Sequence, residues 1–156
     1  MKIKRGSIYN MDKIRIGIVG YGNLGRGVQY ASAQNPDTEV VAVFTRRAPE
    51  TVKTVLPVKV EKYEDMKNYV GKIDVMILCG GSATDLPAQS AEVAKLFNTV
   101  DSFDTHAKIP EYFAALDKSA KDAGHLSAMS IGWDPGLFSL ARIYFGSSLA
   151  DGSTYT

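Results

Sequence analysis

The chain has 156 residues, of which 45% are hydrophobic, enough for one globular domain with a buried core. Its 18 basic and 17 acidic residues are intermixed, so we expect neither a nucleic-acid partner nor a membrane partner. No apolar run approaches the length of a membrane span, and the N-terminal ten residues are too polar for a signal peptide. The single cysteine excludes an internal disulfide framework and favours a cytoplasmic protein, and we expect no metal site.

Residues 13–25, KIRIGIVGYGNLG, predict a strand, a glycine turn and a helix. In a dinucleotide-binding turn, Gly20 would turn the chain, Gly22 would let the backbone approach a pyrophosphate, and Gly25 would let the helix pack on the strand. The N–H groups at the helix start would then face the phosphates. The three glycines alone are weak evidence, but a strand before them and a helix after them favour dinucleotide binding over a structural turn.

The second strand, at residues 39–44, is followed by Thr45, Arg46 and Arg47, where an NAD enzyme usually places an acidic residue. A carboxylate would repel the 2′-phosphate of NADP, whereas guanidinium groups donate charge-assisted hydrogen bonds to it. The sequence therefore predicts NADP as the cofactor. The alternative is that the two arginines belong to a solvated turn.

The rest of the chain continues the alternation of strands and helices. Further strands are predicted at 58–60, 73–79, 99–101 and 126–131, and helices at 24–34, 63–70, 86–97, 110–123 and 136–149. Leu24, Val28 and Ala31 would form the apolar face of the first helix, and the apolar run 73–79 would be a strand buried on both faces. The pattern predicts an α/β fold with a doubly wound parallel sheet of the Rossmann type.

The pattern divides the chain into three segments. We expect an N-terminal extension at 1–12, a dinucleotide-binding domain at 13–150, and the start of a further segment at 151–156.

The loop after residues 73–79, CGGSATD, is rich in glycine and hydroxyl groups. Its glycines would allow close approach to the ribose and nicotinamide of a cofactor, and Ser82 or Thr84 could bond to it. The structural alternative is a glycine turn followed by a helix N-cap, a role that we assign to Asp85 in preference to catalysis. Cys79 is expected to be a small buried hydrophobe and not a nucleophile.

Two further loops carry carboxylates at strand ends. We expect Asp101 to bond the backbone at its strand end, while Asp104 lies further out, where a substrate could reach it. His106 is expected to be exposed and not catalytic. The segment IGWDPG places an indole beside Asp134, which on structural grounds alone would be a helix N-cap followed by Pro135 in the first turn.

The motifs IVGYGNLGRG, TRRA, CGGSATDLP, TVDSFDTH and GWDPGLFS, in this order, resemble the meso-diaminopimelate dehydrogenases. The resemblance covers essentially the whole chain from Met11. It implies an NADP-dependent enzyme of lysine biosynthesis that reversibly deaminates meso-2,6-diaminopimelate at its D-centre. The products would be L-2-amino-6-oxopimelate, which cyclises to tetrahydrodipicolinate, and ammonia. Members of this family are expected to be homodimers.

The resemblance also implies roles for individual residues. Asp104 and Asp134 would bind the substrate and serve in catalysis, with the choice of base left open, and Trp133, Pro135 and Gly136 would complete the substrate site. The cofactor would contact three loops, comprising Gly20, Tyr21, Gly22, Asn23, Leu24 and Gly25; Thr45, Arg46 and Arg47; and Cys79, Gly80, Gly81, Ser82, Ala83 and Thr84.

The family also carries a second domain that supplies much of the substrate pocket and the dimer contacts, and the resemblance implies that residues 151–156 are the start of this substrate and dimerisation domain. Without it we expect cofactor binding only, and an apolar surface where that domain would pack. Two other functions stay open. One is another Rossmann dehydrogenase, such as a dihydrodipicolinate reductase or an enzyme of the glucose–fructose oxidoreductase type, although GWDPG and SFDTH are not expected there. The other is a stand-alone NADPH-binding module without turnover.

Overall fold

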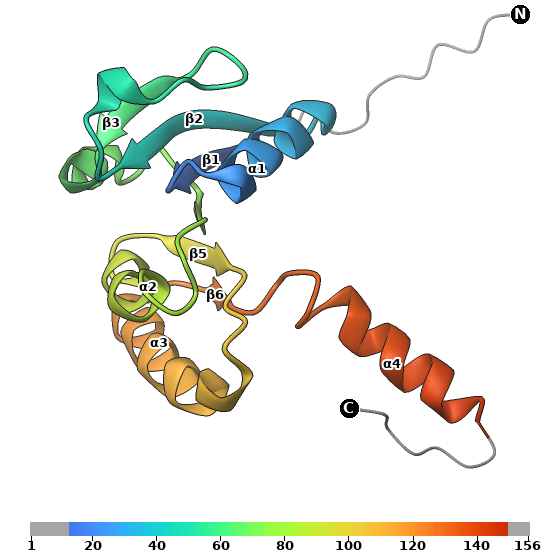
Figure 1. The fold of residues 1–156 in the computed structure, drawn as a ribbon. Coiled ribbons are helices and arrows are strands. Elements are labelled where there is room, and N and C mark those ends of the chain that lie inside the picture. Colours follow the sequence, from blue (N-terminus) through green and yellow to red (C-terminus); the bar gives the residue numbers. More distant parts are fainter. Residues whose placement is uncertain (1–12, 150–156) are drawn as a thin grey trace, which may run out of the picture.

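The computed structural model describes residues 13–149, which form a parallel sheet of six strands with helices on both faces (Figure 1). The strands are β1 (Ile14–Val19), β2 (Thr38–Thr45), β3 (Lys59–Lys62), β4 (Val75–Leu78), β5 (Asn98–Asp101) and β6 (Ser127–Ala128). Their order in the sheet is β3-β2-β1-β4-β5-β6, with every neighbouring pair parallel. This is the Rossmann order, so the predicted fold class is confirmed. The expectations for residues 1–12 and 150–156 lie outside the described residues.

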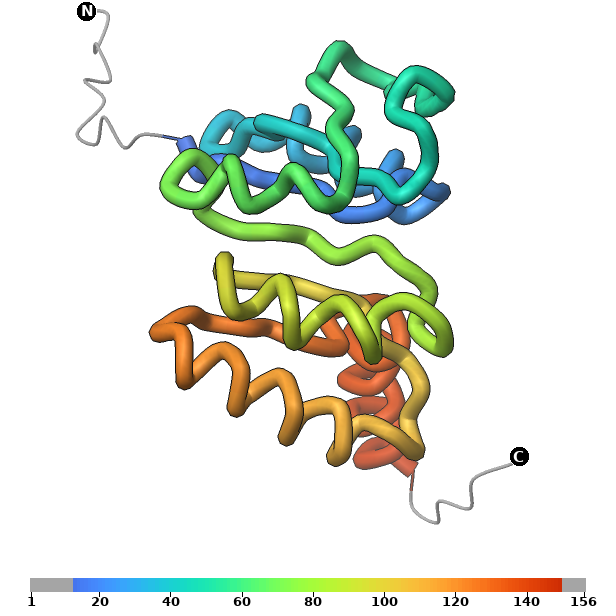
Figure 2. The backbone as a smooth tube through the Cα atoms, turned by 90° about the vertical axis from the view of Figure 1, so that its left-hand side faces the viewer, coloured from blue at the N-terminus to red at the C-terminus, as the bar shows by residue number. Residues whose placement is uncertain are grey.

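Four α-helices and three 3₁₀ segments connect the strands. They are α1 (Asn23–Gln34), α2 (Leu86–Ala94), α3 (Ile109–Ala123), α4 (Leu137–Ser147), η1 (Pro49–Thr51), η2 (Tyr63–Tyr69) and η3 (His106–Lys108). Figure 2 shows η2, α2 and α3 on one face of the sheet and α1 behind it. Every predicted element is present, but residues 63–70 form a 3₁₀ helix and β6 is much shorter than predicted. The sequence patterns did not reveal η1 and η3.

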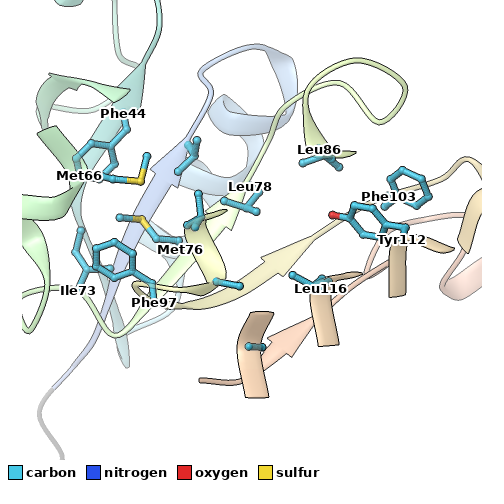
Figure 3. Close-up of a cluster of buried hydrophobic side chains, with 14 of the residues drawn as sticks. Phe44, Met66, Ile73, Met76, Leu78, Leu86, Phe97, Phe103, Tyr112 and Leu116 are labelled. Carbon is cyan, nitrogen blue, oxygen red and sulfur yellow. The ribbon is translucent and has the colours of Figure 1, made fainter. Parts of the chain in front are cut away.

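The larger hydrophobic core lies between the sheet and η2, α2 and α3 (Figure 3). Met76 and Leu78 of β4 point into it and are at most 1% exposed. Phe103 and Tyr112 stack at its far end, with their ring centroids 3.9 Å apart. The stacked pair joins α3 to the loop that follows β5, so the core directly supports a loop that carries a candidate site residue.

The opposite face of the sheet is less completely covered than predicted. On β4, Val75 and Ile77 are only half-buried, so this strand is not buried on both faces. Of the predicted apolar face of α1, Val28 packs against the core, but Leu24 and Ala31 are exposed, so the prediction was wrong for these two. The residues that the helix buries are Gly25, Gln29 and Ser32. On its buried side the helix meets the backbone of the segment around Leu56, where the Gln29 amide donates to the Leu56 carbonyl at 3.0 Å.

The α4 helix extends away from the sheet and has no buried residue (Figure 1). Its large apolar side chains are open to solvent, with Ile143 72% and Tyr144 70% exposed. The described residues thus expose an apolar surface to which α4 contributes strongly, while the packing of a further domain on it stays a prediction. No helix between residues 13 and 149 is both long and apolar enough to cross a membrane.

An ion pair ties the start of β1 to the start of β4. Asp74 accepts hydrogen bonds from the Arg15 backbone N–H at 2.8 Å, from Nε at 3.0 Å and from Nη2 at 2.6 Å. The side-chain bonds first, and then the backbone bond, lower the pKa of Asp74 below its usual value. A carboxylate with a lowered pKa in the folded state stabilises the fold at neutral pH, and this contribution is lost as the pH falls through the lowered pKa.

We therefore expect Asp74→Asn to lower the free energy of unfolding by about 0.5–1 kcal/mol at neutral pH, a small value because the pair is partly exposed. Urea unfolding at neutral and acidic pH should show the difference from the unsubstituted chain shrinking in acid. Asp122→Asn is the matched control, since it breaks an exposed pair on α3 with Lys118 and should change stability little. A pH-independent loss in Asp74→Asn would contradict the assignment.

Candidate functional site

Three loops at the carboxyl ends of β1, β2 and β4 enclose a cavity of about 590 Å³. The three loops that were expected to contact the cofactor therefore lie together, and the contact with the cofactor itself stays a prediction. The lining residues are Gly20, Tyr21, Gly22, Thr45, Arg46, Arg47, Cys79, Gly80, Gly81 and Asp85. Six of the predicted cofactor residues are not part of this lining, namely Asn23, Leu24, Gly25, Ser82, Ala83 and Thr84.

The glycine turn between β1 and α1 forms one wall of the cavity. Gly20 has φ +86°, which favours glycine, and its N–H donates to the Phe44 carbonyl of β2 at 2.9 Å. A Cβ on Gly25 would overlap the carbonyl oxygen of Gly20, so this glycine lets α1 pack close to the turn. The helix begins after Gly22 without a side-chain cap, which leaves its first N–H groups available to an anion. These residues fit the pyrophosphate of a dinucleotide.

Tyr21 lines the cavity but is almost fully buried. Its ring is 4% exposed and its hydroxyl bonds with Gln29, while the Val55 N–H donates to the same hydroxyl at 2.9 Å. The ring therefore anchors the segment around Val55 beside the glycine turn. The Tyr21 carbonyl, in contrast, accepts a hydrogen bond from Nη2 of Arg47 at 2.9 Å.

The two arginines after β2 both line the cavity and are held by different partners. Arg47 is held by the Tyr21 carbonyl, and its backbone N–H donates to Oγ1 of the buried Thr45 at 3.1 Å. Arg46 instead reaches across to Asp85, with Nη2 2.6 Å from Oδ1. Both guanidinium groups thus line the cavity, an arrangement that a merely solvated turn does not require. A phosphate in this region would meet two positive charges.

Asp85 stands at the N-cap position of α2 but makes no capping hydrogen bond, so its predicted role was wrong. Its Oδ2 accepts from the Gly81 N–H at 3.0 Å, and its Oδ1 pairs with Arg46. The Gly81 bond, followed by the pairing with Arg46, lowers the pKa of Asp85 below its usual value. Sequence analysis missed this residue as part of the cavity because its partner lies 39 positions earlier in the chain.

Cys79 is half-buried at the end of β4, and burial raises the pKa of its thiol to about 12. The thiol therefore stays protonated at neutral pH, in agreement with the expectation that it is not a nucleophile. Among residues 13–149 no group of three or more His, Cys, Asp and Glu side chains is placed to hold a metal ion.

Ser82, in the loop between β4 and α2, joins that loop to the one after β5. The Ser82 Oγ accepts from the Asp104 N–H at 2.8 Å and lies 3.4 Å from Oγ1 of Thr105. The hydroxyl thus holds the backbone at Asp104. The carboxylate of Asp104 belongs to an exposed residue, and His106 is also exposed, as predicted.

Asp101 is 2% exposed and connects both loops that carry the candidate substrate carboxylates. Its Oδ1 accepts from the N–H groups of Phe103 at 3.0 Å and Ser130 at 3.1 Å, and its Oδ2 accepts from the Tyr112 hydroxyl at 2.5 Å. The tyrosine also bonds with Ser90, and burial together with Asp101 raises the pKa of Tyr112 above its usual value. The predicted structural role of Asp101 is confirmed.

Asp134 is not the N-cap of α4, contrary to the structural alternative. The turn closes through the Gly132 N–H and the Pro135 carbonyl, 3.1 Å apart, so Gly136 takes the N-cap position. The carboxylate of Asp134 instead accepts from Oγ of Ser139 at 3.2 Å and from Nη2 of Arg142 at 2.5 Å. Sequence analysis missed Arg142, which only the helical geometry of α4 brings back to Asp134.

Trp133 precedes this carboxylate and is 61% exposed. Its indole packs edge-on against Phe138, with centroids 4.8 Å apart. The adjoining Pro135 and Gly136 are half-buried in the turn. The indole of Trp133 and the carboxylate of Asp134 therefore lie on consecutive residues. They belong to the loop that Asp101 holds through the Ser130 N–H, and the indole is open to solvent.

Comparison with known proteins adds the family to this geometry. Residues 14–98 match the model of a family described as the oxidoreductase family with an NAD-binding Rossmann fold. The chain is 59% identical over 146 residues to the meso-diaminopimelate D-dehydrogenase of Lysinibacillus sphaericus, covering 94% of this chain and 45% of the relative. The chain thus spans less than half the length of this curated relative.

Two solved structures are also similar. A multiply substituted meso-diaminopimelate dehydrogenase of Clostridium tetani, solved with diaminopimelate, has 52% identity and a TM-score of 0.80, with 92% of this chain and 44% of that chain covered. An engineered D-amino acid dehydrogenase bound to NADP⁺ has 42% identity and a TM-score of 0.79, with 89% and 42% covered.

Proposed function

The chain belongs to the oxidoreductase family with an NAD-binding Rossmann fold, and we propose that it binds NADP(H) as the cofactor half of a meso-diaminopimelate dehydrogenase. One observation carries the cofactor assignment. Arg46 and Arg47 line the same cavity as the glycine turn at Gly20 and Gly22. A pyrophosphate would meet the N–H groups of the turn and of α1, and a 2′-phosphate would meet the two guanidinium groups.

The proposed reaction converts meso-2,6-diaminopimelate, water and NADP⁺ to L-2-amino-6-oxopimelate, ammonia, NADPH and a proton. When bound, NADP⁺ supplies the hydride acceptor. The protein must hold the substrate's α-ammonium and remove a proton from it before hydride can leave the α-carbon. We assign the binding to Asp104 and Asp134, with Trp133, Pro135 and Gly136 forming the adjoining wall.

The two carboxylates differ in their surroundings. Arg142 and Ser139 already bond with Asp134, whereas the side chain of Asp104 is open to a cation. This difference favours Asp104 as the group that takes the proton, with Asp134 orienting the ammonium. The protein is further proposed to be a homodimer of the cytoplasm that serves lysine biosynthesis, as its resemblance to the dehydrogenases implies.

Turnover requires that the reacting atoms be shielded from water more completely than these residues allow. Hydride transfer needs the reacting atoms about 3–3.5 Å apart and shielded from water. Trp133 is 61% exposed, and Asp104 also faces solvent. We therefore propose that the 156-residue chain binds the cofactor without turning over the substrate. This also keeps the non-catalytic NADPH-binding module as a second candidate.

Calorimetric titration with NADPH and then NADH tests the cofactor assignment. The chain should bind NADPH more tightly, and Arg46→Ala or Arg47→Ala should weaken NADPH binding by about ten- to a hundredfold while leaving NADH nearly unchanged. Lys118→Ala is the control, because it removes an exposed positive charge on α3, away from the cavity. Equal losses for the two cofactors would contradict the 2′-phosphate assignment.

Turnover is tested by adding meso-2,6-diaminopimelate and NADP⁺ and measuring NADPH and released ammonia. Tight NADPH binding without ammonia release is the expected result. Formation of NADPH and ammonia would contradict the proposal that this chain only binds, while supporting the dehydrogenase reaction. Failure to bind either cofactor would contradict the proposed function as a whole.

A further inference from the structure

Arg46 and Asp85 form an ion pair across the mouth of the cavity, between the end of β2 and the turn before α2. Nη2 of Arg46 lies 2.6 Å from Oδ1 of Asp85. The arginine side chain is 60% exposed and the aspartate side chain 21% exposed. The aspartate is therefore the more buried partner, and it holds the more exposed side chain of Arg46.

The loop between β4 and α2 holds the Asp85 carboxylate in position. Its second oxygen, Oδ2, accepts from the Gly81 N–H at 3.0 Å. A Cβ on Gly80 would lie 2.7 Å from the Cβ of Asp85, so this glycine makes room for the aspartate to fold back over the turn. One side chain thus joins the backbone of the β4–α2 turn to the guanidinium that follows β2.

The pair leaves Arg46 able to bind a second anion. A guanidinium group has five N–H donors, and the bond from Nη2 to Asp85 uses one of them. Arg47 is restrained in a comparable way by the Tyr21 carbonyl. Without Asp85, the long and exposed side chain of Arg46 would sample several rotamers and would have to be ordered when a phosphate binds.

A charge effect opposes this ordering effect. The ionised carboxylate of Asp85 repels a phosphate, although Arg46 and the Gly81 N–H both share its charge. The carboxylate accepts from the Gly81 N–H through one oxygen and from Arg46 through the other, so both of its oxygens are already engaged. The ordering of Arg46 must outweigh the repulsion for Asp85 to favour phosphate binding, and the Asp85→Asn variant measures which effect is larger.

We propose that Asp85 is a positioning residue that holds Arg46 toward the 2′-phosphate of NADP(H) and so contributes to the preference for NADP(H) over NAD(H). The proposal rests on the proposed function, because it takes the cavity to be the NADP(H) site. It assigns to Asp85 no contact with the reacting atoms.

Asp85→Asn separates the two bonds of the carboxylate. Its amide oxygen can still accept from the Gly81 N–H, but its amide nitrogen cannot accept from Arg46. We expect this variant to bind NADPH about two- to fivefold more weakly and NADH unchanged, a size typical of an exposed ion pair. Asp85→Ala also loses the Gly81 bond and should weaken binding of both cofactors.

The decisive measurement is a double-mutant cycle with Arg46→Ala, in which the dissociation constants of NADPH and NADH are determined by titration of the whole chain. In the Arg46→Ala background, Asp85→Asn should no longer affect NADPH binding. A purely structural role of Asp85 would weaken both cofactors in both backgrounds, and that result would overturn the proposal. Tighter NADPH binding in Asp85→Asn would also overturn it, because the carboxylate would then be a competitor.

The cycle separates this proposal from the proposed function. If Arg46→Ala weakens NADPH and NADH equally, the 2′-phosphate assignment itself fails. If Arg46→Ala weakens NADPH selectively and Asp85→Asn changes nothing, the cofactor site stands and the positioning role of Asp85 is overturned.

Discussion

Replacement of Asp101 by alanine is expected to lower the free energy of unfolding by about 3–5 kcal/mol, because several buried donors lose a charged acceptor. The backbone N–H groups of Phe103 and Ser130 donate to Oδ1, and the Tyr112 hydroxyl donates to Oδ2. Asp101 is 2% exposed, so water does not replace these bonds without rearrangement. Loss of the carboxylate should also loosen the two loops that carry Asp104 and Asp134.

Urea unfolding of Asp101→Ala measures this loss, and two variants calibrate it. Asp104→Ala, three positions later, removes an exposed carboxylate and should change the free energy of unfolding by less than about 0.5 kcal/mol. Tyr112→Phe removes one of the three donors and should cost about 1–2 kcal/mol. Similar losses of unfolding free energy for Asp101→Ala and Asp104→Ala would contradict the stabilising role of the Asp101 hydrogen bonds.

Gly25→Ala is expected to destabilise the chain by about 2–4 kcal/mol, although alanine favours helix over glycine elsewhere. A Cβ at this position would overlap the carbonyl oxygen of Gly20, a backbone atom of the turn that cannot move aside like a side chain. The Gly20 N–H also bonds to Phe44 of β2, so a shift of the turn would disturb the sheet. Cofactor affinity should fall with stability, because the same turn forms the cavity wall.

Gly27→Ala, on the same helix, is expected to increase the stability of the chain. A Cβ there would meet no atom within 4 Å, so this variant should gain about 0.5–1 kcal/mol from helix propensity and reduced unfolded-state entropy. Thermal or urea unfolding of the pair gives the comparison directly. A gain in stability for Gly25→Ala would refute the close packing of α1 against the glycine turn.

Much of the fold follows from local patterns in the chain. The β-branched run before Gly20 favours an extended strand, as β1 shows, and Pro110 and Gly124 mark the two ends of α3, where Gly124 has φ +72°. Strands that alternate with helices can form a parallel sheet only through crossover connections, which places the loops after β1, β2 and β4 at one edge. For this reason the sequence alone assigns the glycine turn and both arginines to one cofactor.

The partners of the polar side chains could not be assigned in this way. Asp85 resembles a helix cap by position, yet it bonds to Gly81 and to Arg46, 39 residues away. Likewise Asp134 resembles a cap by position but pairs with Arg142. The Ser82 hydroxyl, which was expected to contact the cofactor, accepts a hydrogen bond from the backbone N–H of Asp104. Capping preferences are worth about 1 kcal/mol, so a charged partner brought near by the fold can override them.

The buried face of α1 illustrates the same limit for apolar residues. Helical periodicity identifies Leu24, Val28 and Ala31 as one apolar stripe, but it does not identify the surface that the helix meets. The chain folds the segment around Leu56 against this helix, and Gln29 then satisfies the Leu56 carbonyl at 3.0 Å. Secondary structure thus depends on neighbours within a few residues, whereas the choice of buried face and of ion-pair partners depends on segments that only the folded chain brings together.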